Sequence, residues 1–94
     1  MIEYLFNAVI ATAAQDITIS AKITDTTNDI NNYHLNFFGK DGELIGTYEG
    51  KNVEGIWEFT IPATATLGLK GRYWYCLCDK SHYKLNFKQP LYLK

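Results

Sequence analysis

The chain has 94 residues, enough for one domain, and 47% of them are apolar and 15% aromatic, which is sufficient to fill a core in a small protein. Its net charge of −1 lacks the basic excess by which nucleic-acid-binding and membrane-surface proteins attract their partners. We therefore expect a single domain over residues 1–94, with neither nucleic acid nor a membrane as partner.

The N-terminal part of the chain predicts two strands, Glu3–Ala11 and Gln15–Asp25. In the second, isoleucines and one alanine alternate with polar residues, which is typical of a strand with one buried face. The apolar run 5–14 is far shorter than the roughly 20 residues of a membrane span. Glu3 stands where a secretion signal carries positive charge, so no signal peptide is expected.

The middle of the chain predicts a hairpin. Short polar residues at 26–32 indicate a turn, and Tyr33–Gly39 resumes the alternation of a strand. Asp41–Gly42 favours a type I′ turn, in which both central residues have positive φ. Glu43–Tyr48 is then the return strand, and Gly50–Glu54 is predicted to be a loop.

The strongest pattern lies between Gly55 and Asp79. Aromatic and aliphatic residues alternate with polar ones in Gly55–Ile61, and after Pro62 a short stretch rich in Thr and Gly suits a turn that crosses between sheets. The next strand begins at Arg72. The predicted core residues are Trp57, Phe59, Ile61, Tyr73 and Tyr75.

At the C-terminal end, Asp79–His82 indicates a turn, and Tyr83–Lys88 is predicted to pair with Tyr73–Cys78 as a hairpin. Pro90 cannot donate a backbone hydrogen bond, so Leu91–Leu93 is expected at a sheet edge or after a bulge.

About seven short strands with regular turns predict an all-β chain, folded as an immunoglobulin-like, two-sheet antiparallel β-sandwich. Tyr73 at the head of its strand matches the tyrosine corner of such sandwiches. Tyr75 stands where antibody domains carry a cysteine, so no inter-sheet disulfide is expected there.

Cys76 and Cys78 face the same side of one predicted strand, where the Cβ atoms of an i, i+2 pair splay apart. This spacing is poorly suited to a mutual disulfide and favours a reducing compartment. With His82, and with His34 as a fourth ligand, the two cysteines are weak candidates for a zinc site. One intervening residue on a strand is the wrong geometry for zinc, so we expect no metal or other cofactor, and small apolar roles for both cysteines.

Catalytic signals are weak. The carboxylates stand mostly in predicted turns, where bonding to the backbone explains them, and no glycine-rich phosphate loop precedes a helix. We therefore expect a protein that is not an enzyme. The acidic turn residues are Asp25, Asp29, Asp41, Glu43 and Asp79.

Trp74 is predicted to point away from the core and, with Tyr83 and Phe87, to form a candidate interaction surface. Such a surface would contact another protein subunit or stack on a sugar. Alternatively, Trp74 packs beneath the N-terminal strand or the loop around Tyr48.

The distribution of charge is a second signal for association between copies, because residues 1–49 carry a net charge of −5 and residues 50–94 a net charge of +4. Copies would meet head to tail if the halves formed separate faces; interleaved strands would cancel the asymmetry.

The order of these motifs resembles the small immunoglobulin-like structural proteins of tailed bacteriophages and prophages, including the N-terminal domain of phage baseplate upper proteins. The matching pieces are Ala14–Ile17, Asp29–Asn32 before Tyr33–Phe37, Asp41–Gly42, Phe59–Ala63 and Thr66–Tyr75. Asn31–Asn32 replaces the Thr-Gly of that family's turn, and Cys76 and Cys78 have no counterpart in it.

The resemblance implies a non-enzymatic virion or assembly protein, located in the virion or in the host cytoplasm during assembly. Its partners would be other phage structural proteins or further copies of itself. The alternative from the residues is a carbohydrate-binding or adhesin-type β-sandwich module.

Overall fold

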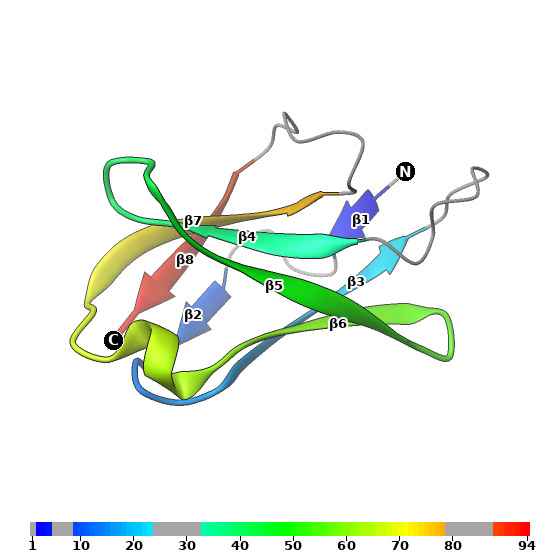
Figure 1. The fold of residues 1–94 in the computed structure, drawn as a ribbon, viewed down its shortest axis with the longest axis horizontal. Helices are drawn as coiled ribbons and strands as arrows, with labels where there is room; N and C mark the ends of the chain where they lie inside the picture. The colour runs from blue at the N-terminus through cyan, green and yellow to red at the C-terminus, as the bar shows by residue number, and fades with distance from the viewer. Residues whose placement is uncertain (1, 5–8, 24–32, 79–87) are drawn as a thin grey trace.

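The computed structural model describes residues 2–4, 9–23, 33–78 and 88–94, and in them the chain is all-β with no α-helix (Figure 1). One short 3₁₀-helix, η1 (Ala63–Thr66), is present. The strands are β1 (Ile2–Tyr4), β2 (Val9–Ala11), β3 (Ile17–Ile23), β4 (His34–Phe38), β5 (Leu44–Val53), β6 (Ile56–Ile61), β7 (Gly71–Cys78) and β8 (Gln89–Leu93).

The strands form one mixed sheet in the order β1-β3-β6-β5-β4-β7-β8-β2. All neighbours are antiparallel except β2 and β8, which run parallel. The two ends of the sheet, β1 and β2, are consecutive in the chain, so the sheet curls until it is nearly closed as a barrel. A curled sheet of this kind buries one face in a single interior and leaves the other face outside.

The long strand β5 joins the two halves of the sheet, and it shows that the predicted loop at Gly50–Glu54 is wrong. Up to Glu49 it pairs with β4, and from Gly50 onward it pairs with β6 (Figure 1). Gly50 lies against the rings of Trp57 and Phe59, where a side chain would collide with them. A glycine at this point lets one strand pass from one half of the sheet to the other.

The hairpin turns differ in type from the prediction. The predicted type I′ turn at Asp41–Gly42 is wrong, because only Gly42 has positive φ (85°). A hydrogen bond from the Gly42 N–H to the Gly39 carbonyl closes a three-residue loop instead. The type I′ dihedrals occur at Glu54 (φ 52°) and Gly55 (φ 89°), between β5 and β6.

The two ends of the chain also depart from the predicted pairing. The predicted strand Glu3–Ala11 is two strands, β1 and β2, at opposite ends of the sheet order. In the described residues β7 pairs with β8 through Gly71–Tyr75, and β8 also pairs with β2, so β8 is no edge strand. Pro90 pairs only with Trp74, outside the stretch where β2 runs alongside. Most of the predicted strand Tyr83–Lys88 lies outside the described residues.

The core occupies the inside of the curled sheet and includes all five predicted core residues. Phe59, Ile61 and Tyr75 are fully buried, and Trp57 and Tyr73 are nearly so. Aromatic rings contact one another across the strands: Tyr73 packs on Phe37 with ring centroids 5.8 Å apart. The turn after Pro62, with η1, carries the chain from β6 to β7 across this core.

Candidate interaction surface

The outward side of β7 carries Trp74 and the two cysteines. Tyr73, Tyr75 and Leu77 belong to the core cluster, so by alternation Trp74, Cys76 and Cys78 face the other side of the sheet. Trp74 is half-buried, whereas both cysteines are buried. The outer face of the sheet therefore has a covered part around the cysteines and an open part that begins at Trp74.

The open part starts with an apolar row that crosses four strands. Leu44 of β5 lies opposite Phe38 of β4, Phe38 lies opposite Trp74 of β7, and Trp74 lies opposite Pro90 of β8. Paired residues of neighbouring strands share one face, with Cβ atoms about 5 Å apart. Leu44 is 58% exposed and the other three are half-buried.

A second row continues this surface toward the end of the sheet. Arg72 of β7 lies opposite Tyr92 of β8, and Tyr92 lies opposite Ile10 of β2. Tyr92 is 50% exposed and Ile10 is 68% exposed. The two rows together form what we call the outer-face strip, which consists of Ile10, Phe38, Leu44, Arg72, Trp74, Pro90 and Tyr92.

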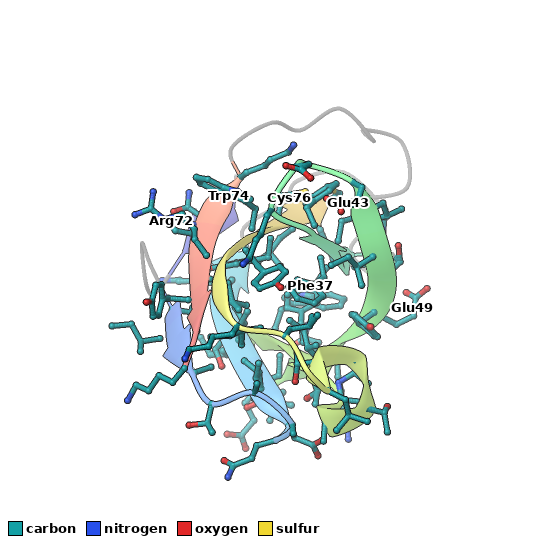
Figure 2. The ribbon with its side chains drawn as sticks, turned by 90° about the vertical axis from the view of Figure 1, so that its left-hand side faces the viewer. Phe37, Glu43, Glu49, Arg72, Trp74 and Cys76 are labelled. Carbon is teal, nitrogen blue, oxygen red and sulfur yellow. The ribbon has the colours of Figure 1, made fainter. Side chains whose placement is uncertain are left out.

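Cations lie over two rings of the outer-face strip. The Lys88 ammonium stands 4.7 Å from the centre of the Phe38 ring, and the Arg72 guanidinium 5.9 Å from that of Trp74. Figure 2 shows Arg72 and Trp74 together on the outside of the molecule, across the sheet from Glu43. The strip is thus apolar and aromatic with a positive fringe.

The covered part of the same face holds a polar network. The Asn36 amide donates a hydrogen bond to the Cys78 sulfur (3.6 Å), and its oxygen accepts one from the Thr47 hydroxyl (2.9 Å). The sulfurs of Cys76 and Cys78 lie 3.1 Å apart, and neither is in a disulfide. The hydrogen bond from Cys78 lowers the pKa of Cys76, helped by Asn36 and the charge of Lys88 and opposed by burial.

The candidate zinc ligands are only partly brought together. His34 lies opposite Cys78 across the β4–β7 pair, whereas His82 lies outside the described residues. In the described part of the chain, no group of three or more His, Cys, Asp or Glu side chains is arranged to hold a metal ion. The same part contains no helix long and apolar enough to cross a membrane.

Of the three residues predicted to form the interaction surface, the structure places only Trp74. Trp74 lies on the outer-face strip, but Tyr83 and Phe87 lie outside the described residues. Tyr48 packs against the core, on the other side of the sheet from Trp74. In the described part of the chain, strands from residues 1–49 and from residues 50–94 interleave in the sheet order, so the charges on these strands do not form two separate faces.

Sequence reasoning missed most of the outer-face strip. Phe38, Leu44, Tyr92 and Ile10 come from four strands that are distant in sequence. Alternation gives a sequence signal only for Phe38 and Tyr92, which neighbour core positions, and for Ile10, whose neighbours pack against the core; Leu44 lies beside the exposed Ile45. Only the order of the strands in the sheet shows that they meet.

Comparison with known proteins concerns the fold. No protein-family model and no curated protein matches the chain. Among 23 matching chains of solved structures, one comes from a study of T cell specificity and activation by the bacterial superantigen toxic shock syndrome toxin-1. The alignment covers 100% of this chain and 98% of that chain, with a TM-score of 0.53 and 11% identity. At this identity the likeness shows a shared β-fold and carries no function.

Proposed function

We propose that the chain is a non-enzymatic, immunoglobulin-like structural protein of a tailed bacteriophage or prophage, which binds protein partners through the outer-face strip. The observation that carries the contact role is the continuity of the strip across β5, β4, β7, β8 and β2. The phage assignment rests on the motif resemblance described above.

The strand pairing supports the immunoglobulin-like part of the proposal. One ladder runs β1-β3-β6-β5 and the other β5-β4-β7-β8-β2. With β1 and β2 counted together as strand A, and β3 to β8 lettered B to G, the first ladder reads A-B-E-D and the second contains C-F-G, as in the ABED and CFG sheets of immunoglobulin-type sandwiches. The departure is β5, which is shared by both ladders.

The composition of the strip supports protein contact. Aromatic residues and arginine are the residue types enriched in the centres of protein interfaces, and Trp74, Tyr92 and Arg72 lie side by side here. A monomeric protein rarely leaves such an apolar row uncovered. Arg72 and Lys88 add positive charge, so the matching surface on a partner should carry carboxylates beside apolar residues.

Binding measurements with purified proteins encoded by neighbouring genes test this proposal. We expect one of them to bind the wild-type chain, and Trp74→Ala or Tyr92→Ala to weaken binding at least about tenfold, as removal of a hot-spot side chain does. Thr60→Ala, an exposed change on β6 in the other ladder, is the matched control and should leave affinity unchanged. Neighbours unrelated to virion assembly, or equal effects of all three changes, would contradict the proposal.

Tyr92 and Trp74 also favour one second candidate, a carbohydrate-binding module. Both rings lie on the same sheet face, and sugars stack on exposed aromatic rings. A glycan array distinguishes the two functions. Binding of a defined glycan that is lost in Tyr92→Ala, without binding of any assembly protein, would favour the sugar-binding function.

A further inference from the structure

We propose that Cys76 and Cys78 form a reversible disulfide by exchange with a small-molecule disulfide such as oxidised glutathione, with Cys76 as the attacking thiol. This dithiol site lies on the covered part of the outer face and is separate from the outer-face strip, so the inference does not depend on the proposed contact function.

The geometry of the two sulfurs is the first observation. The i, i+2 spacing on β7 separates the Cβ atoms, yet the side chains converge until the sulfurs are 3.1 Å apart. That separation is about 1 Å longer than a disulfide bond. Neither cysteine belongs to the hydrophobic core cluster, and the exposed fraction of the residue is 3% for Cys76 and 0% for Cys78.

The polar surroundings of the pair are the second observation. A purely apolar role would leave the cysteines among apolar side chains, but Asn36 directs its amide N–H toward Cys78. The Thr47 hydroxyl, by donating to the Asn36 oxygen, fixes which way that amide points. The hydrogen bond from Cys78 lowers the pKa of Cys76 most, and the Asn36 amide and the nearby Lys88 charge lower it further, against the effect of burial.

The exchange proceeds in two steps. The Cys76 thiolate attacks one sulfur of oxidised glutathione, forms a mixed disulfide and expels one glutathione thiolate. Cys78 loses its proton to water, and its thiolate attacks the Cys76 sulfur and expels the second glutathione. Two cysteine thiols are thereby oxidised, and one glutathione disulfide is reduced to two thiols.

The product is expected to be easily reduced. Residues i and i+2 of a strand are about 6.5 to 7 Å apart at Cα, which is the upper limit for a disulfide. Because β4 pairs with β7 as far as Cys78, the strand resists the shortening that would relax this strain. A strained disulfide has a more oxidising potential, so a reducing compartment keeps the pair as thiols.

Mass spectrometry of the folded, full-length chain tests the proposal after incubation with oxidised glutathione. We expect a product lighter by two hydrogens, without bound glutathione, that dithiothreitol converts back. Cys78→Ser should retain one glutathione on Cys76, and Cys76→Ser should react several-fold more slowly. Two glutathione adducts on the wild-type chain, or thiols that react only in urea, would overturn the proposal.

A second measurement separates a reactive pair from two merely buried cysteines. Cys78→Ser keeps a hydroxyl donor beside Cys76, so the pH at which Cys76 is half-alkylated by iodoacetamide should lie below that of the urea-unfolded chain. Thr47→Val in the same background should move this midpoint upward, because the Asn36 amide is then no longer oriented. A midpoint equal to that of the unfolded chain in both variants would contradict the assigned role of the network.

Discussion

Among single residues, the turn between β5 and β6 shows most directly how backbone conformation limits the choice of side chain. Glu54 and Gly55 both have positive φ, and the Gly55 N–H donates to the Asn52 side-chain oxygen. A left-handed residue other than glycine costs about 1–2 kcal/mol, and asparagine tolerates this region better than glutamate does.

We therefore expect Glu54→Asn to raise the free energy of unfolding by about 0.5–1 kcal/mol. Gly55→Ala should lower it by about 1 kcal/mol through backbone strain alone, because no atom lies within 4 Å of the added Cβ. Urea denaturation measures both changes, and the slope with urea should stay constant. A Gly55→Ala protein as stable as the wild type would show that this turn does not need the left-handed conformation.

This turn also shows a limit of prediction from sequence. Asp41–Gly42 carries the usual hairpin dipeptide, whereas Glu54 is an unusual residue for a type I′ turn. Pairing of Val53 with Ile56 leaves only two residues for the connection between β5 and β6, and that pairing imposes the conformation. Tertiary pairing thus overrides local preference, and alternation within Gly55–Ile61 does not reveal it.

At the scale of elements, β5 carries two glycines that face the core, Gly46 and Gly50, and they differ in what surrounds them. A Cβ on Gly50 would lie 2.8 Å from the Trp57 ring and even closer to Phe59, and both rings are buried. A Cβ on Gly46 would meet the Tyr48 hydroxyl at 2.5 Å, but Tyr48 is only partly buried and its ring can move.

We expect Gly50→Ala to destabilise the protein by about 1–3 kcal/mol, the usual cost of an overpacked core. Gly46→Ala, on the same strand and facing the same way, is the matched control. It should be within about 1 kcal/mol of the wild type, since alanine suits a strand interior better than glycine. Thermal or urea unfolding measures both, and equal losses would mean that β5 does not depend on close approach at Gly50.

Sequence patterns predicted these elements unevenly, for a physical reason. Alternation in Gln15–Asp25 and Gly55–Ile61 predicts β3 and β6 well, because one face of each strand is buried against the core. Glu3–Ala11 is predicted to be one strand, yet β1 and β2 pair with different strands at opposite ends of the sheet. The alternation of apolar and polar residues along a strand indicates which face is buried. Which strand lies next to it in the sheet depends on contacts between residues that are distant in sequence.

For the whole molecule, the inner face of the curled sheet carries the core that stabilises the fold, and the outer face carries the outer-face strip that we propose binds partners. The core residues of β6 could be predicted from sequence because Trp57, Phe59 and Ile61 alternate with Glu58 and Thr60. The outer-face strip could be predicted only at Trp74. Its other members become neighbours through the order of β5, β4, β7, β8 and β2, which no local pattern contains.

Phe37 and Phe38 are adjacent on β4 and test this separation, because they lie on opposite faces of the sheet. Phe37 is fully buried against Tyr73, so Phe37→Ala should cost about 3–5 kcal/mol and leave little of the stability of a small domain. Phe38 is half-buried beneath Lys88, so Phe38→Ala should cost only about 1 kcal/mol. Urea unfolding measures the loss of stability in both variants.

In the partner-binding assay, Phe38→Ala should remain folded and bind at least about tenfold more weakly. A folded Phe38→Ala protein with wild-type affinity would place the contact surface elsewhere, because Phe38 links Leu44 to Trp74 in the apolar row.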